Sequence, residues 1–187
     1  YEKVNDQAVL EILEKRGGCV NCPFGCGKYV KVEEDGFECV NEGPEYETIA
    51  LIAGNCDIMD INATVKINDV CDRIGVDTIS AGNIIGLAIE SMRRGLVPPI
   101  DGLDLDYGKP KAVLKFLDMM VKGEGIAADF AKGQKFLIGK YDLKDLAMQV
   151  KGLGFAGYDP RQFRGFALSY GVAPEGPTHL RSVYHGI

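Results

Sequence analysis

A loop of closely spaced cysteines constrains this chain more than any other feature. Cys19, Cys22 and Cys26 follow a C-x2-C-x3-C spacing, with Pro23 and several glycines among them. Thiolates this close converge on one centre, and glycines let the backbone turn so that N–H groups approach the sulfurs. We therefore predict that the three cysteines ligate an iron–sulfur cluster. A structural zinc site or free thiols are the alternatives; zinc usually takes its ligands as two pairs, and the sequence has no second C-x2-C pair.

The sequence leaves the fourth ligand of such a cluster open. A cubane cluster takes four ligands. Cys39, Cys56 and Cys71 each stand alone in the sequence. One of them could complete the site, with Cys39 as the first candidate, or the ligand could come from a part of the protein outside this chain.

Length and composition exclude several classes of protein. The 187 residues can bury one good core, and a net charge of −6 disfavours a nucleic-acid surface. No apolar run approaches the length of a membrane span, and the first residues are no signal peptide. Six cysteines without a small, disulfide-dense character indicate a reducing compartment, so we expect a cytoplasmic protein. The chain starts without Met, as expected for a piece of a larger protein.

Apolar periodicity and capping residues predict an all-α, multihelical chain with one small β-hairpin. The hairpin joins residues 28–32 and 37–40 around Asp35-Gly36, a strong turn signal. We expect a single helical domain over 1–187, with the cysteine loop and hairpin in 17–42 and a helical body in 45–187. The expected N-caps are Asp60, Asp77 or Thr78, and Asp142. The predicted helices are 6–15, 45–54, 61–74, 78–94, 110–120, 126–132, 134–138, 142–148 and 160–170.

Two acids bracket a tight corner between two of these helices. Asp72 lies near the end of one helix, Gly75 and Val76 make the turn, and Asp77 opens the next helix. A carboxylate at a helix N-terminus can accept two parallel N–H bonds from a planar heterocycle such as an aminopyrimidinone. Plain capping by Asp77, with Asp72 as a solvated acid, explains the same residues.

Two glutamates and a histidine are candidates for proton transfer. Glu45 and Glu47 follow a rigid Gly-Pro corner, and burial in a cleft would raise the pKa of such a carboxyl group. His179 can exchange a proton near neutral pH, and Arg181 can bind a phosphate. The alternatives are simple first-turn charge for the glutamates and a structural role for the histidine.

Taken in order, these segments resemble the tungsten-dependent aldehyde ferredoxin oxidoreductase family, in its middle helical domain. The resemblance covers nearly the whole chain, and the ordered set is specific although no single piece is. The matching segments are Cys19-x2-Cys22-Pro23-x2-Cys26-Gly27, Gly43-Pro44-Glu45-Tyr46-Glu47-Thr48, Asp72-x2-Gly75-Val76-Asp77-Thr78-Ile79-Ser80, Lys151-Gly152-Leu153, Tyr158-Asp159-Pro160-Arg161 and His179-Leu180-Arg181.

The resemblance implies an enzyme that oxidises aldehydes to carboxylic acids and passes two electrons through a [4Fe–4S] cluster to ferredoxin. It implies tungsten, or molybdenum, held by the dithiolenes of two pyranopterins. Val76 replaces the usual Leu of the family's pterin motif. The implied site residues are Cys19, Cys22 and Cys26 for the cluster, Asp72, Gly75, Val76, Asp77, Thr178, His179 and Arg181 for the pterin cofactor, and Glu47, Glu45 and His179 for catalysis.

The resemblance also places two domains outside this chain: an N-terminal β domain, and a second helical domain carrying the fourth cluster cysteine. The isolated chain is therefore expected to be inactive. Lys66 and Asp69 stand where some members carry a Glu-x-x-His iron site shared across a dimer, so we predict neither that iron nor that dimer. We expect no nucleic-acid or membrane partner. The competing function is a non-catalytic iron–sulfur or zinc module for electron transfer or partner binding.

Overall fold

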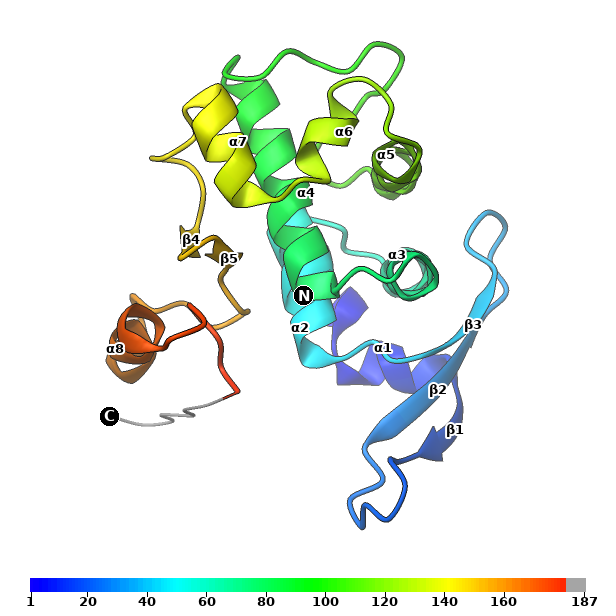
Figure 1. Ribbon diagram of the computed structural model, residues 1–187. Coiled ribbons are helices and arrows are strands. Elements are labelled where there is room, and N and C mark those ends of the chain that lie inside the picture. The colour runs from blue at the N-terminus through cyan, green and yellow to red at the C-terminus, as the bar shows by residue number, and fades with distance from the viewer. Residues whose placement is uncertain (181–187) are drawn as a thin grey trace.

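The computed structural model describes residues 1–180, so the predicted site residue Arg181 lies outside the described residues. The described chain is mostly helical, with two small antiparallel sheets (Figure 1). Its helices are η1 (Glu2–Val4), α1 (Asp6–Glu11), α2 (Tyr46–Thr48), the π-helix η2 (Ile49–Gly54), α3 (Ile61–Ile74), α4 (Thr78–Arg93), α5 (Pro110–Lys122), α6 (Ala127–Phe130), α7 (Gln134–Tyr141) and α8 (Arg164–Val172). Its strands are β1 (Leu13–Gly17), β2 (Gly27–Val32), β3 (Cys39–Glu42), β4 (Gln149–Val150) and β5 (Leu153–Gly154). None of the helices in residues 1–180 is long and apolar enough to cross a membrane.

The prediction of a mainly helical chain is confirmed, but the prediction of one small hairpin was wrong, because the larger sheet has three strands. β1, β2 and β3 are antiparallel neighbours in that order. Residues 13–17, expected to continue the first helix, instead pair with β2, with Gly17 opposite Gly27. At the other end of β2, Val32 pairs with Cys39. Val30 and Val32 are buried because alternate residues of a strand face the core. The β4–β5 pair is a second, separate hairpin.

The two longest helices lie where the sequence predicts them. Asp60 caps α3, since its Oδ1 accepts the N–H groups of Asn62 at 2.9 Å and Ala63 at 3.2 Å. Gly75 ends α3 in the left-handed conformation, at a φ of 73°. Asp77 then caps α4. Capping chemistry therefore sets both sides of this corner.

Two predicted boundaries near the C-terminus were wrong. Asp142 does not cap a helix; it has a left-handed backbone with a φ of 54° and ends α7, and residues 143–148 form no helix. Aspartate tolerates this conformation better than most residues. α8 begins at Arg164 rather than Pro160, because the Asp159 carboxylate accepts both the backbone N–H and the guanidinium of Arg161, which holds a turn there.

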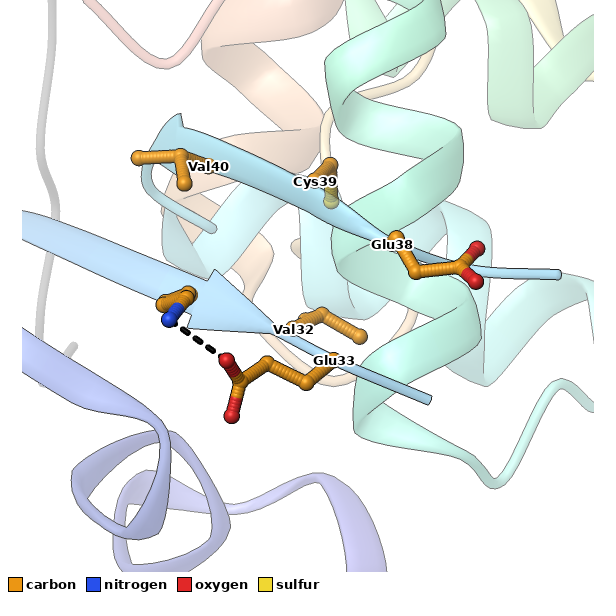
Figure 2. Close-up of a pocket in the computed structure, with 6 residues that line it drawn as sticks. Val32, Glu33, Glu38, Cys39 and Val40 are labelled. Carbon is orange, nitrogen blue, oxygen red and sulfur yellow. Dashed lines mark ion pairs between the residues drawn. The ribbon is translucent and has the colours of Figure 1, made fainter. Parts of the chain in front are cut away.

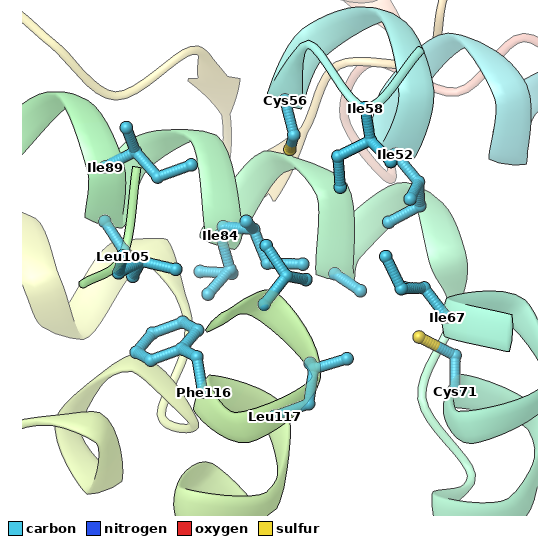
Figure 3. Close-up of a cluster of buried hydrophobic side chains, with 14 of the residues drawn as sticks. Ile52, Cys56, Ile58, Ile67, Cys71, Ile84, Ile89, Leu105, Phe116 and Leu117 are labelled. Atoms are coloured by element: carbon cyan, nitrogen blue, oxygen red, sulfur yellow. The ribbon is translucent and has the colours of Figure 1, made fainter. Parts of the chain in front are cut away.

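One hydrophobic core joins η2, α3, α4 and α5 (Figure 3). Ile52, Ile67, Ile89 and Phe116 are fully buried in it, and each burial contributes about 1.5–3 kcal/mol. α4 lies directly on η2: a Cβ at Gly82 would be 2.4 Å from the carbonyl oxygen of Leu51. Glycine is therefore required where these two helices meet.

α8 packs on a smaller apolar cluster of its own, with Phe166 and Tyr170 buried. Tyr158 stacks on Phe166 with ring centroids 4.9 Å apart. In Figure 1, α8 lies beside the β4–β5 hairpin and apart from α5 and α6. The segment between β5 and α8 reaches back to α2, where the hydroxyl of Tyr46 donates to the carbonyl of Gly157 at 2.8 Å. This contact brings the C-terminal part of the chain to α2.

Candidate functional site

An acidic pocket of about 320 Å³ lies where α2 meets the corner between α3 and α4. Glu45, Glu47, Asp72 and Asp77, four of the predicted site residues, all line it. They come from two separate segments, so the fold assembles them at one place. The acidic pocket is lined by Glu42, Gly43, Glu45, Glu47, Thr48, Asn68, Asp72, Asp77, Thr78 and Ile79.

Asp72 and Asp77 each use one carboxylate oxygen within the fold. Oδ2 of Asp72 accepts the side-chain amides of Asn41 at 2.9 Å and Asn68 at 3.2 Å. Oδ2 of Asp77 accepts the N–H of Ser80 at 2.8 Å as the N-cap of α4. Among residues 1–180, neither Oδ1 atom has a hydrogen-bond partner. Both acids therefore keep an acceptor available to a group in the acidic pocket.

Hydroxyl and amide groups hold the walls of the acidic pocket together. Oγ1 of Thr48 lies 2.8 Å from Oγ1 of Thr78 and donates to Oδ1 of Asn68 at 3.3 Å. The Asn68 amide donates to Asp72 and, at 3.3 Å, to the carbonyl of Glu42. Thr48 and Asn68 are buried, and buried polar groups are costly to leave without these bonds. The network fixes Asp72 relative to α2.

Glu47 is largely buried, as expected of a proton carrier. Its side chain is 13% exposed, and its Oε2 accepts the backbone N–H of Gly157 at 2.7 Å. Its Oε1 is buried, has no hydrogen-bond partner within residues 1–180, and lies 3.6 Å from Nδ1 of His179. Desolvation raises the pKa of Glu47, against the lowering effects of the Gly157 N–H and His179. A carboxyl group in this state suits general acid–base chemistry.

Two tyrosine rings lie next to the Glu47–His179 pair. The ring of Tyr158 lies 5.6 Å from the His179 ring and 5.2 Å from that of Tyr46. Burial raises the pKa of both tyrosines, so their hydroxyls stay protonated near neutral pH. The rings therefore add apolar surface beside the pair without adding charge.

Asn68 and Gly157 belong to the site although sequence reasoning did not predict them. A Cβ at Gly157 would be 2.6 Å from the Cβ of Ala50 and 3.2 Å from Oε2 of Glu47, so only glycine allows this approach. No spacing signals that contact, because its partners are 110 residues apart. Asn68 did carry a signal: it lies four residues before Asp72, on the same helix face.

The remaining predicted residues lie at the margins. Glu45 is 65% exposed and pairs with Lys28 at 3.5 Å, so Glu47 holds the buried position of the two. Val76 is partly exposed after the turn at Gly75. Thr178 accepts the N–H of Leu180 at 3.2 Å and directly precedes His179.

The cysteine loop is closed at its base by the pairing of Gly17 with Gly27. Inside the loop, the N–H of Cys22 donates to the carbonyl of Cys19 at 3.0 Å. The thiols of Cys19, Cys22 and Cys26 are free and exposed, which gives three of the four donors that a cubane cluster requires. They are not gathered around one point: within residues 1–180, no group of three or more His, Cys, Asp or Glu side chains is arranged to hold a metal ion.

Cys39 is too far from that loop to be its fourth ligand. β2 runs from Gly27, next to Cys26, to Val32, which is paired with Cys39. Five residue steps at about 3.4 Å put Cys39 about 17 Å from the loop along the strand. Figure 2 shows Cys39 on β3, in an open pocket of about 430 Å³ that also contains the ion pair between Lys31 and Glu33.

Cys56 and Cys71 are excluded as cluster ligands by burial. Both side chains lie in the main core with no exposed surface (Figure 3). Burial raises the pKa of each thiol to about 12, which disfavours the thiolate that binds metal. Within the described chain, no cysteine is therefore positioned to complete the set of four.

Comparison with known proteins gives matches over nearly the whole chain. A family model for aldehyde ferredoxin oxidoreductase, domains 2 and 3, matches residues 1–186. The tungsten-containing aldehyde ferredoxin oxidoreductase of Pyrococcus furiosus is 29% identical over 185 residues, which cover 97% of this chain and 30% of that protein. The WOR-like subunit of an aliphatic sulfonate oxidoreductase from the same organism is 29% identical over 177 residues, covering 89% of this chain and 28% of that subunit.

A solved structure shares the fold. The BamBC active-site complex of benzoyl-coenzyme A reductase, bound to 1,5-dienoyl-CoA, superposes with a TM-score of 0.71 at 16% identity. The match covers 94% of this chain and 27% of that one. At this identity, the likeness concerns the fold alone.

These matches place the chain among the helical domains 2 and 3 of a family of oxidoreductases. The chain belongs to the aldehyde ferredoxin oxidoreductase family, as the resemblance of its motifs indicated. It spans about 30% of the length of the curated relatives that it matches over most of its own length.

Proposed function

We propose that this chain is the helical part of an enzyme that oxidises aldehydes to carboxylic acids, with ferredoxin as the electron acceptor. The observation that carries the proposal is the position of Glu47: it lines the acidic pocket with Asp72 and Asp77, and its buried Oε1 lies 3.6 Å from His179. The acidic pocket would thus place acceptors for a polar heterocycle, Asp72 and Asp77, beside Glu47, a carboxyl group that can hold a proton. Four tungsten-containing aldehyde ferredoxin oxidoreductases at 28–29% identity support the aldehyde as substrate.

Asp72 and Asp77 would hold one pterin of a tungsten (or molybdenum) bis-pyranopterin. A pterin carries an amino group and ring N–H groups, which need acceptors when they leave water. The free Oδ1 atoms of the two acids are such acceptors, at the edge of the acidic pocket. Asn41 and Asn68 hold Asp72 in place through its Oδ2 atom.

Cys19, Cys22 and Cys26 would supply three ligands of a [4Fe–4S] cluster. Their thiols are free, exposed and confined to one closed loop. Because Cys39, Cys56 and Cys71 are distant or buried, the fourth ligand would come from another domain of the same protein. The remaining length of the relatives leaves room for such domains.

Glu47 and His179 would manage the protons of the reaction. An aldehyde and water yield a carboxylic acid, two protons and two electrons. Desolvation raises the pKa of Glu47, which favours the protonated carboxyl group, and His179 is the group within reach of its buried oxygen. Bound tungsten and the cluster supply the redox chemistry and the electron path to ferredoxin.

The test is turnover by the full-length protein purified without oxygen. We expect aldehyde-dependent reduction of ferredoxin, together with tungsten or molybdenum, pterin fluorescence and iron in the sample. An aliphatic sulfonate is the second substrate to assay, because a sulfonate oxidoreductase subunit is as similar in identity as the aldehyde enzymes. Turnover of the sulfonate alone would overturn the aldehyde assignment. A metal content of zinc alone, without turnover, would instead favour a non-catalytic module.

A further inference from the structure

A second polar pocket, of about 150 Å³, lies between α4, η2 and α7, outside the acidic pocket. Asn55, Asn83, Glu90, Tyr107 and Gln134 are its polar lining residues. We call it the amide pocket, because three of these side chains are amides. Neither the pterin motif nor the cysteine loop contributes a residue to it.

The nitrogen atoms of two of these amides are already engaged. Nδ2 of Asn55 donates to the carbonyl of Gly82 at 3.0 Å. Nδ2 of Asn83 donates to the carbonyls of Ile79 at 2.9 Å and Phe155 at 2.8 Å, which uses both of its hydrogens. These bonds fix how each amide is turned. Asn83 then has only its oxygen left to offer to the amide pocket, whereas Asn55 has its oxygen and one remaining N–H.

Gln134 supplies the strongest sign that the amide pocket holds something. The residue is only 5% exposed, and its Oε1 is buried without a hydrogen-bond partner within residues 1–180. Buried amide oxygens are nearly always bonded, because an unbonded one has lost its water without replacement. A donor or a cation in the amide pocket would satisfy this atom.

The charged group at the amide pocket is an acceptor as well. Oε1 of Glu90 pairs with the guanidinium of Arg94 at 2.6 Å, and Oε2 accepts the hydroxyl of Tyr107 at 3.2 Å. The Tyr107 proton is thereby directed to the carboxylate, so its oxygen adds another lone pair. The lining offers three amide oxygens and an ionised carboxylate, so it suits a ligand that is positive.

From this geometry we infer that the amide pocket binds a small monovalent cation, an alkali ion or ammonium, through Gln134, Asn55, Asn83 and Glu90. Neutral carbonyl oxygens with a single carboxylate, itself shared with Arg94, give too little negative charge for a well-held divalent ion. Transition metals favour imidazole and thiolate ligands, which the lining lacks. The volume admits an ion with a few of its own waters, since a water occupies about 30 Å³ in the liquid.

The bound cation would join three elements of the fold. Asn83 and Glu90 lie on α4, Asn55 follows η2, and Gln134 begins α7. α4 is the helix that Asp77 caps at the acidic pocket. Binding would therefore stabilise the native state by mass action and slow the opening of α4 and α7.

The test compares the full-length protein in potassium, sodium, ammonium and N-methylglucamine chloride at one ionic strength. We expect one of the small cations to raise the Tm by about 2–4 °C in a saturable way, and to slow amide hydrogen exchange in 79–90 and 134–141. Gln134→Met, which keeps the volume and removes the oxygen, should abolish both effects. Gln162→Met, at an exposed glutamine outside the amide pocket, should keep them.

Two results would overturn the inference. Equal Tm and equal exchange in all four salts would mean that the amide pocket contains water alone. A cation effect that persists in Gln134→Met would mean that the ion binds elsewhere. Comparison of the three small cations identifies which kind of cation binds. An effect of ammonium alone indicates a hydrogen-bond donor, whereas an effect of potassium or sodium alone indicates coordination by the oxygens.

Discussion

The buried carboxylate oxygen of Glu47 lies 3.6 Å from Nδ1 of His179, although the two residues come from distant parts of the chain. The other oxygen of Glu47 is held by the backbone N–H of Gly157. One oxygen is thus fixed in position while the other faces the histidine. This arrangement is what a positioned proton carrier requires.

Replacing either member of this pair should slow turnover and leave the cofactor bound. Glu47→Gln keeps the bond from Gly157 but cannot take up or release a proton, and His179→Ala removes its partner. In the full-length enzyme we expect each change to lower kcat by about 10²–10⁴-fold. Tungsten and iron contents are the controls. Full metal content with wild-type turnover in both variants would return the pair to a structural role.

Glu47→Gln should also change how the free energy of unfolding depends on pH. Desolvation raises the pKa of Glu47 above its ordinary value near 4.5, so folding favours the protonated carboxyl group. That contribution is complete below pH 4.5 and is lost as the pH rises through the raised pKa. The glutamine of this variant would stay neutral at every pH. As the pH rises through the raised pKa of Glu47, the free energy of unfolding of the Glu47→Gln variant should therefore increase relative to that of the wild type. Urea titrations of the cofactor-free protein at several pH values measure the difference. A constant difference would contradict the raised pKa.

Two substitutions at Asp77 should separate capping from pterin binding. Asp77→Ala removes the acceptor for the Ser80 N–H and should cost about 0.5–2 kcal/mol, whereas Asp77→Asn preserves that cap. Both variants lose the charged acceptor, so both should contain less pterin and tungsten. The measurements are the Tm of the cofactor-free protein and the pterin fluorescence of the purified enzyme. Full pterin occupancy in both variants would show that Asp77 is a cap and no more.

The packing of α4 on η2 should tolerate no side chain at Gly82. A Cβ there would be 2.4 Å from the carbonyl oxygen of Leu51, so Gly82→Ala must push the two helices apart. We expect a loss of about 1–3 kcal/mol in the free energy of unfolding. Gly139→Ala is the matched control, since a Cβ at Gly139 meets nothing within 4 Å. This second change should stabilise α7 by about 0.5–1 kcal/mol. Equal stabilities for the two variants would disprove the close contact.

Local chemistry made part of this fold predictable. Asp60, Gly75 and Asp77 act through neighbours in sequence, so the ends of α3 and the start of α4 were predicted correctly. β1 was not predicted, because Leu13–Gly17 has a strand conformation only through its pairing with β2. Helical propensity was overridden there by a partner that lies beyond the cysteine loop.

In the candidate site too, contacts between residues distant in sequence could not be predicted. The acids were visible as motifs, but the contact that buries Glu47 is made by Gly157, a glycine with no local signal. Which of Glu45 and Glu47 is buried also depends on the fold, since both follow the same corner. Sequence therefore indicated the chemical groups, and tertiary contacts decided which of them meet.

Cysteine substitutions should show which thiols carry the cluster. Cys26→Ser in the full-length protein removes one ligand from the loop and should lower its iron content and visible absorbance. Cys39→Ser is the matched control: this thiol is about 17 Å along β2 from the loop, so iron should stay at the wild-type level. Iron loss in the Cys39 variant equal to that in the Cys26 variant would contradict the strand register.

The isolated 187-residue chain should not hold a cluster by itself, because residues 1–180 offer three suitable thiols and no fourth. Reconstituted without oxygen, it should fail to keep a stoichiometric [4Fe–4S] cluster through desalting, since metal sites depend on a full set of ligands. Its exposed thiols should instead oxidise readily in air. The measurement is iron and sulfide per chain after gel filtration. A cluster that survives at four irons per chain would mean that the fourth ligand lies within this sequence after all.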